Sequence, residues 1–158
     1  SKVFSKHSML IAMESRQAGG DINSPKLAAS ITRAKKDSMP KENIDRAVAK
    51  GAGTDGVRLE EIMFEGYGPG GVAMLIQTVT DNNNRTAPLI RHVFSKAGLE
   101  IGSPGSAAWA FEKTADGYKP TNPMELDDAT GEKLADFIEK LEEEEDVTNI
   151  YTTADSEE

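Results

Sequence analysis

The feature that most constrains the fold of this chain is a run of glycines around one tyrosine and one proline, over residues 65–71. Glycine readily adopts positive φ and proline fixes its own φ, so this run favours a chain reversal. Apolar residues flank it, which predicts strands over residues 59–64 and 72–79. Residues 81–84 are typical of a helix start, so we expect a helix from near Arg85. The glycines lead into a strand rather than a helix N-terminus, which argues against a phosphate-binding loop.

Charge divides the chain more sharply than its net charge of −9 suggests. The first 58 residues carry a net charge of +5, and residues 59–158 carry −14. This asymmetry, together with a length of 158 residues, favours two small domains, a basic one over 1–58 and an acidic one over 59–158. The basic segment is expected to meet a polyanion, although ordinary solvated helix faces would give the same composition.

The chain lacks cysteine and any long apolar run, which limits where it can work. The absence of cysteine excludes disulfides and thiolate metal sites and fits a reducing compartment. No apolar stretch approaches the roughly 20 residues that span a bilayer, and residues 1–4 lack a signal-peptide core. We therefore expect a soluble chain without a membrane partner, in the cytoplasm or, alternatively, the mitochondrial matrix. The sequence leaves its oligomeric state open.

Three short amphipathic helices are predicted in the basic segment. Apolar residues at three- and four-residue spacing precede the glycine pair at 19–20, where the first helix should end. Ser24 and Pro25 should begin the second helix as its N-cap and first helical residue. The third helix should begin at Pro40 and end with Gly51 as its C-cap. Their apolar faces would pack into a small bundle.

The exposed faces of these helices hold the candidate nucleic-acid contacts. Glu42 and Asp45 share the surface of the third helix and would repel a phosphate backbone, which disfavours base readout in a groove. Scattered phosphate contacts, salt-dependent and weakly sequence-specific, fit better. Glu42 could also pair with Arg46 at i,i+4 spacing, and both arrangements can hold together. The basic residues expected at the interface are Lys2, Lys6, Lys26, Arg33, Lys36, Lys41, Arg46 and Lys50.

Neither histidine has the neighbours that a metal site or a catalytic base requires. His7 lies on an apolar stripe, where a partly buried packing role is common, and His92 has no second histidine at ligand spacing. The acidic run over 142–146 lacks the spacing of a calcium loop and fits a solvated face or a partner patch. No nucleophile with an adjacent base is apparent. We therefore expect no metal, no cofactor and no enzymatic activity.

The acidic segment is predicted to form an antiparallel layer with helices on one face of the strands. The whole chain would then be an α+β protein, with an N-terminal three-helix bundle followed by a ferredoxin-like α/β domain. Asp127 and Asp128 precede its last helix. Its other predicted elements are a helix from Arg85 to Ala97, a strand over 106–111, a loop over 114–123, a strand over 147–151 and a frayed polar tail over 154–158.

Six segments of the chain resemble a known family. They are residues 39–47, 67–73, 80–86, 91–96, 102–106 and 146–151. Together, and in this order, they resemble the YebC/PmpR family over nearly the whole chain. The resemblance implies a three-helix N-terminal domain followed by α/β domains, no enzymatic activity and a role in gene expression. It also singles out the motif-loop residues Tyr67, Gly68, Pro69, Gly70, Asn84 and Arg85.

The chain departs from the pattern of this family at two places. It opens at residues 1–4, near the family's Lys-Arg-Gly-Lys-Ile-Phe position, without the longer basic segment with which members usually begin, so much of the expected nucleic-acid surface is absent. Between Lys113 and Pro123, where the family inserts a further small α/β domain, only a short loop is expected. We therefore expect two domains where the family has three.

The resemblance leaves functions of different kinds open. Some family members are described as DNA-binding transcriptional regulators. Others, including the mitochondrial translational activator of cytochrome c oxidase subunit one, associate with ribosomes and act on translation. We favour an RNA-binding translation factor that contacts ribosomal RNA, because acids lie among the basic residues of the third helix and the whole chain is acidic. A regulator that binds duplex DNA is the first alternative, and an acidic protein-protein adaptor is the second.

Overall fold

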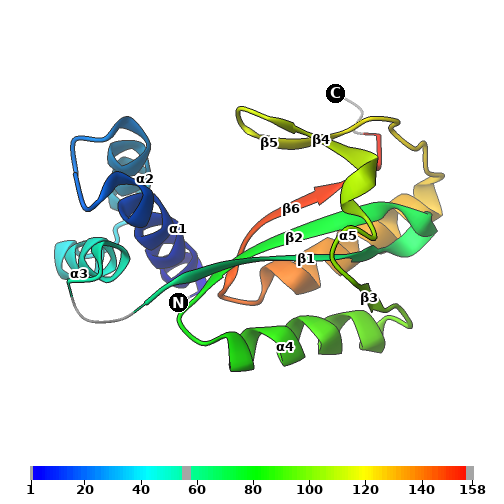
Figure 1. Cartoon of the computed structure of the whole chain (residues 1–158), viewed down its shortest axis with the longest axis horizontal. Helices are drawn as coiled ribbons and strands as arrows, with labels where there is room; N and C mark the ends of the chain where they lie inside the picture. The colour runs from blue at the N-terminus through cyan, green and yellow to red at the C-terminus, as the bar shows by residue number, and fades with distance from the viewer. Residues whose placement is uncertain (1, 55–57, 156–158) are drawn as a thin grey trace. The chain divides into compact units, whose positions relative to one another are not determined.

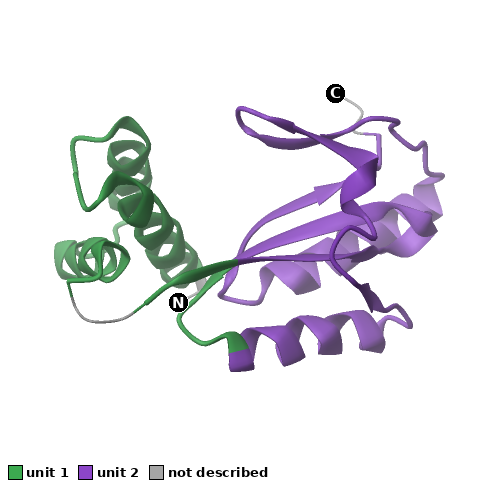
Figure 2. Ribbon diagram, viewed as in Figure 1, with its two compact units in different colours: residues 1–61, 79–83 green, residues 62–78, 84–158 purple. Residues whose placement is uncertain are grey.

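The computed structural model describes residues 2–54 and 58–155, and the chain forms two compact units (Figures 1 and 2). The first, here called the helical unit, comprises Ser1–Glu61 and Val79–Asn83. The second, the α/β unit, comprises Ile62–Thr78 and Asn84–Glu158. The divisions at 61/62 and 78/79 fall inside strands, so each unit is built from separate stretches of the chain.

Three helices form most of the helical unit, as predicted. α1 spans Lys2–Ala18, α2 spans Pro25–Lys36 and α3 spans Lys41–Ala52. Ser24 occupies the N-cap of α2, although its hydroxyl makes no capping bond. Apolar burial holds these short helices together, at about 1.5–3 kcal/mol for each large side chain. The buried residues of this core are Ile11, Leu27, Ala34, Met39, Ile44 and Ala47.

Gly51 lies at a close contact between α1 and α3. A Cβ at this position would lie 2.1 Å from the carbonyl oxygen of Ala12, so only glycine fits without a shift of the backbone. Nearby, the Ser15 hydroxyl donates to the carbonyl oxygen of Val48 at 2.6 Å and joins the same two helices. The predicted C-cap role of Gly51 is therefore wrong. The helix continues past it to Ala52, and its C-cap is Gly53, whose φ of 78° suits a glycine in that role.

The α/β unit is built on a four-stranded sheet with the strand order β3-β1-β2-β6. β1 (Glu60–Tyr67) and β2 (Ala73–Thr80) flank the glycine run as predicted, and a short 3-10 helix over Pro69–Gly71 joins them. β3 (Ile101–Gly102) pairs antiparallel with β1, and β6 (Val147–Thr152) pairs antiparallel with β2. The predicted α+β class, with N-terminal helices followed by antiparallel strands, is confirmed.

Both faces of β2 are covered (Figure 1). The covering elements are α4 (Asn83–Lys96), α5 (Asp128–Glu142) and the hairpin of β4 (Phe111–Thr114) and β5 (Gly117–Pro120). Met74 and Ile76 pack with Phe94 of α4 and Phe137 of α5, whose rings meet edge to face with centroids 5.0 Å apart. Leu75 points to the opposite face and packs with the hairpin. This two-sided burial explains why β2 is apolar at most of its positions.

The chain between β3 and α5 differs from the prediction. The predicted strand over 106–111 is wrong, because Ala108–Ala110 form a 3-10 helix and β4 begins only after it. The buried alanines there, Ala107 and Ala110, lie three residues apart, which is a helical spacing rather than the alternation of a strand. The predicted loop over 114–123 is also wrong, because it contains β5.

Boundaries elsewhere fall close to their predicted positions. α4 begins at Asn83, two residues before the predicted start. Asp127 is the N-cap of α5, and its carboxylate accepts a first-turn backbone N–H at 2.8 Å. In the predicted frayed tail, the N–H of Asp155 donates to the carbonyl oxygen of Met124 at 2.7 Å, so the expectation is wrong at that residue. Residues 156–158 lie outside the described part of the chain.

Candidate nucleic-acid interface

The predicted phosphate contacts of α2 form one exposed strip, here called the α2 strip. Its members, Lys26, Arg33 and Lys36, are spaced seven and three residues apart and so lie along the same side of the helix. The Arg33 guanidinium donates to the hydroxyl of Ser30 at 3.0 Å. Within residues 2–54 and 58–155, no member of the strip forms an ion pair with a carboxylate. The α2 strip therefore presents three cationic groups to solvent.

Two of the predicted contacts on α3 are engaged with carboxylates. The Lys41 ammonium lies 2.8 Å from Asp45 on the same helix, and this hydrogen bond and the carboxylate charge raise the pKa of Lys41. The Lys50 ammonium lies 2.9 Å from Asp81, which follows β2, and both side chains are about 30% exposed or less. A phosphate that approached either lysine would have to compete with a carboxylate. These two lysines are therefore weaker candidates than the α2 strip.

Arg46, the third predicted contact on α3, hydrogen-bonds to the side chain of Asn43. The expected pairing of Glu42 with Arg46 is wrong. The i,i+4 ion pair of this helix joins Lys41 to Asp45, and Arg46 bonds to Asn43 instead. Arg46 is nevertheless exposed on α3, with a guanidinium that can reach solvent. Among the predicted residues of α3 it is the best placed to meet a polyanion.

The remaining predicted contacts lie on α1. Lys6 is half-buried on that helix, while Lys2 is its first residue and has a side chain outside the described part of the structure. On the next position, His7 is mostly buried and its Nε2 lies 2.6 Å from the carboxylate of Asp37, the C-cap residue of α2. This contact ties α1 to the end of α2 and fits the packing role predicted for His7.

Neither a metal centre nor a membrane span is found in the described residues. No group of three or more histidines and carboxylates within residues 2–54 and 58–155 could hold a metal ion. His92 is exposed on α4. Over the same residues, no helix is both long enough and apolar enough to cross a bilayer.

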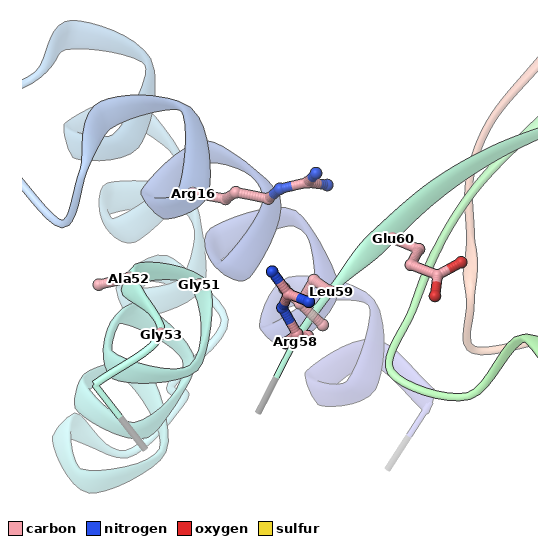
Figure 3. A pocket seen from close by; sticks show the side chains of 7 residues that line it. All are labelled: Arg16, Gly51, Ala52, Gly53, Arg58, Leu59 and Glu60. Carbon is pink, nitrogen blue, oxygen red and sulfur yellow. The ribbon is translucent and has the colours of Figure 1, made fainter. Parts of the chain in front are cut away.

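A pocket in the helical unit brings together two arginines that the sequence did not single out. Figure 3 shows the guanidinium groups of Arg16, from the last turn of α1, and Arg58, just before β1, extending over the same hollow. The cavity has a volume of about 380 Å³. We call it the arginine pocket. Its lining residues are Arg16, Gly51, Ala52, Gly53, Arg58, Leu59 and Glu60.

Buried neighbours fix the backbone on which these two arginines stand. Ser15, next to Arg16, is fully buried against α3, and Leu59, next to Arg58, packs with Met13 and other apolar residues of the helical unit. The two arginines are 42 residues apart in sequence. No motif or spacing connects them, so only the folded chain could identify the pair.

The motif loop of the hairpin is explained largely by packing. Gly70 has a φ of 81°, and a Cβ there would lie 2.7 Å from the side chain of Thr130 on α5. A Cβ on Gly68 would lie 2.4 Å from the sulfur of Met74. Pro69, which lies between these two glycines, is the first residue of the short 3-10 helix. The glycines therefore let the turn lie tightly against its own unit, which is a structural role.

Tyr67, the first residue of that motif, holds an exposed tryptophan in place. Its hydroxyl donates to the carbonyl oxygen of Ser106 at 2.7 Å and accepts the indole N–H of Trp109 at 2.9 Å. Trp109 is 70% exposed, and its indole N–H also lies 2.9 Å from the Ser106 carbonyl oxygen. The orientation of this indole is thus set within the α/β unit, although its ring faces solvent.

Glu65, on β1, anchors the loop that carries Trp109. Its buried carboxylate accepts the backbone N–H groups of Gly105 at 2.8 Å, Ala107 at 3.0 Å and Ala108 at 2.7 Å. Burial alone would raise the pKa of Glu65, but these three donors together outweigh it and hold that pKa below its ordinary value. The carboxylate therefore stays ionised and satisfies donors that a strand would have paired.

Arg85, the last motif-loop residue, anchors α4 to the chain before β6. Its Nη2 lies 3.0 Å and 3.1 Å from the two carboxylate oxygens of Asp146. Thr86 donates its hydroxyl to the same buried carboxylate at 2.5 Å. Two of the motif segments noted in the sequence therefore meet here, which gives Arg85 a structural role. Asn84 is exposed beside it.

Comparison with known proteins identifies the family. The model of the "TACO1/YebC protein N-terminal domain" matches residues 1–54, and that of the "TACO1/YebC second and third domain" matches residues 59–116. A relative from Syntrophus aciditrophicus, called "Probable transcriptional regulatory protein", is 33% identical over 217 residues that take in 98% of this chain and 87% of the relative. The chain belongs to the TACO1/YebC family. The resemblance to YebC/PmpR proteins is thus confirmed.

Other TACO1/YebC relatives and one solved structure agree with this assignment. A protein of the same name from Desulfatibacillum aliphaticivorans is 43% identical over 98% of this chain and 63% of its own length. One from Desulforapulum autotrophicum is 50% identical over 71% of this chain and 46% of its own length. The chain thus spans about half to two thirds of these relatives. A crystal structure of a conserved hypothetical protein from Aquifex aeolicus matches with a TM-score of 0.84 and 28% identity, over 99% of this chain and 91% of that one.

Proposed function

We propose that this chain is a non-enzymatic regulator of gene expression that binds nucleic acid through the helical unit. The observation that supports this most directly is the α2 strip, three exposed cations without a carboxylate partner among the described residues, in a chain whose net charge is −9. Lysine and arginine without a carboxylate partner are the usual contacts to phosphate. The names of the relatives, "Probable transcriptional regulatory protein", agree with a regulatory role.

We further propose that the target is RNA of the ribosome and that the protein acts as a translation factor. The carboxylates of Asp45, on α3, and Asp81, after β2, lie beside Lys41 and Lys50, so negative charge would accompany α3 into a DNA groove. A contact limited to phosphates along one helix tolerates such neighbours better than groove insertion does. The names of the relatives favour the alternative, a transcriptional regulator that binds duplex DNA.

Binding as a function of salt tests the role of the α2 strip. We expect that changing all three of its residues to glutamine lowers the slope of log affinity against log salt by about 2, since each phosphate contact to a single strand contributes about 0.7. The loss should be similar for RNAs of different sequence. The matched control changes three exposed lysines of the α/β unit to glutamine, Lys113, Lys133 and Lys140, and should leave the slope nearly unchanged.

Crosslinking in living cells separates the two targets. The tagged protein is irradiated with ultraviolet light, treated separately with RNase and DNase, and the attached nucleic acid is sequenced. Ribosomal RNA clustered at one region would support the translation factor, whereas discrete promoter fragments would support the DNA-binding regulator. If the glutamine variant of the α2 strip kept full activity and nothing were crosslinked, a protein-protein adaptor would replace both.

A further inference from the structure

We propose that the arginine pocket is a binding site for a phosphate group. The inference extends the proposed function, on which it rests for the source of the phosphate, because it places a built anion site in the same helical unit. Arg16 and Arg58 come from different elements and extend over one hollow (Figure 3). A guanidinium is always protonated at neutral pH and offers paired N–H donors that match two oxygens of a phosphate.

The described residues that line the pocket carry more positive than negative charge, which favours an anion. The chain has 27 acidic residues against 18 basic ones, yet within the described residues neither Arg16 nor Arg58 has an ion-pair partner. Among the lining residues that the structure describes, Glu60 is the one carboxylate, and Figure 3 shows it turned away from both guanidinium groups. The neighbouring Glu61 accepts a hydrogen bond from Gln17 at 3.3 Å. Two like charges over one hollow repel each other, and a bound anion would relieve that repulsion.

The wall of the pocket formed by the end of α3 leaves room for an anion. Two of the carbonyl groups at this helix end, which would otherwise repel an anion, are already hydrogen-bonded. Gly53 has open space where a Cβ would stand, and the neighbouring wall residues are Gly51 and Ala52, so the side chains of this wall are small or absent. A helix C-terminus normally presents free carbonyl groups, which repel anions. Here the carbonyl oxygens of Ala49 and Lys50 already accept hydrogen bonds from the C-cap residues.

The pocket is also prepared before binding. Leu59 is buried and fixes the backbone of Arg58, while α1 and α3 are locked by their contact at Gly51, beside Arg16. An anion would therefore order two side-chain ends rather than a segment of chain, which lowers the entropic cost of binding. A phosphodiester of a nucleic acid and a small phosphorylated compound would present the same oxygens to the two guanidinium groups.

Isothermal titration of the full chain with pyrophosphate tests the site. We expect saturable binding by the unaltered protein and a loss of at least about tenfold in affinity for Arg16→Gln combined with Arg58→Gln, because charge-assisted hydrogen bonds are lost from both. The double variant Arg16→Lys and Arg58→Lys keeps both positive charges but loses the paired N–H donors of the guanidinium groups. Its affinity for pyrophosphate should be intermediate. The matched control, Lys113→Gln combined with Lys140→Gln, removes two positive charges from exposed positions of the α/β unit and should leave pyrophosphate binding unchanged. Circular dichroism melting checks that each variant is folded.

Titration with a short single-stranded RNA, as a second arm, identifies the source of the phosphate. If the Arg16/Arg58 glutamine pair weakens binding of both pyrophosphate and RNA, while the Lys113/Lys140 glutamine pair weakens neither, the pocket is a phosphate site used by nucleic acid. If only pyrophosphate binding is lost, the pocket is supported as a site for a small phosphorylated compound. Unchanged pyrophosphate binding by a folded glutamine pair, or no binding by the unaltered protein, overturns the proposal. If RNA did not bind at all, the result would count against the proposed function. The pyrophosphate titration would then still decide whether the pocket binds phosphate.

Discussion

Replacing Glu65 by glutamine should destabilise the α/β unit by about 2–4 kcal/mol. One carboxylate oxygen accepts the N–H groups of Ala107 and Ala108, and the other accepts that of Gly105. A glutamine can turn its single carbonyl oxygen toward the first two donors, but its NH2 group then faces the third. The N–H of Gly105 would lose a hydrogen bond to a charged group, which costs about 1.5–3 kcal/mol, and a neutral acceptor also weakens the two remaining bonds.

Urea unfolding followed by tryptophan fluorescence measures this change directly. Trp109 is the one tryptophan of the sequence and lies on the loop that Glu65 anchors. We expect a lower midpoint for Glu65→Gln with an unchanged denaturant slope. The matched control is Glu112→Gln, because that exposed glutamate forms a surface ion pair with Lys119 and its replacement should change the free energy of unfolding by less than about 1 kcal/mol. If Glu65→Gln lay within about 0.5 kcal/mol of the unaltered protein, the anchoring role argued from these three bonds would be refuted.

The same carboxylate makes the stability of the α/β unit depend on pH. The pKa of Glu65 in the folded chain is held below its ordinary value. The ionised carboxylate therefore contributes its full share to the stability of the unit above the unfolded pKa of about 4.3. That contribution is lost as the pH falls through the lower folded pKa, where the carboxylate takes up a proton. The unaltered protein should therefore lose stability in this acidic range more steeply than Glu65→Gln does, as urea midpoints at several pH values would show.

Two further substitutions test other contacts. Gly51→Ala should destabilise the helical unit by roughly 1–3 kcal/mol, because the new methyl group would overlap the carbonyl oxygen of Ala12. Gly131→Ala is its control, because that helical glycine has open space around it and should give a gain of up to about 1 kcal/mol; equal melting temperatures for the two variants would contradict the argument. Tyr67→Phe removes the hydroxyl that accepts the indole N–H of Trp109, so we expect lower fluorescence anisotropy and a loss of about 1 kcal/mol or less. An unchanged anisotropy would mean that the Ser106 carbonyl alone orients the indole.

Local patterns were sufficient to predict most elements of this fold. The apolar spacing along the first 52 residues predicted three helices, and the glycine run predicted the turn between β1 and β2. The strand assigned to 106–111 failed because a side chain far along the sequence decides its backbone. Glu65 takes up the N–H groups of Ala107 and Ala108, which leaves the loop without the pairing that a strand requires.

The candidate site was only partly accessible from sequence for a similar reason. Residue type and helix periodicity were enough to place the α2 strip on an exposed face. They could not reveal that Asp81 lies beside Lys50 or that Arg16 and Arg58 share a pocket, because each pair is joined by folding across more than 30 residues. Gly51 was misassigned for the same reason, since its requirement for glycine comes from Ala12 on another helix.

The division of the chain into two interleaved units affects how it can fold as it is synthesised. Val79 belongs to the helical unit, where it is fully buried in a cluster with Met13 and Leu59, and Asp81 of the same short segment pairs with Lys50. Domains generally fold as units, N-terminal first, during translation. Here the N-terminal unit cannot complete its core when its third helix leaves the ribosome, and must wait until the whole β1–β2 hairpin has followed. A nascent chain stalled just after Leu59 should consequently hold its three helices less firmly than one stalled beyond Asn83.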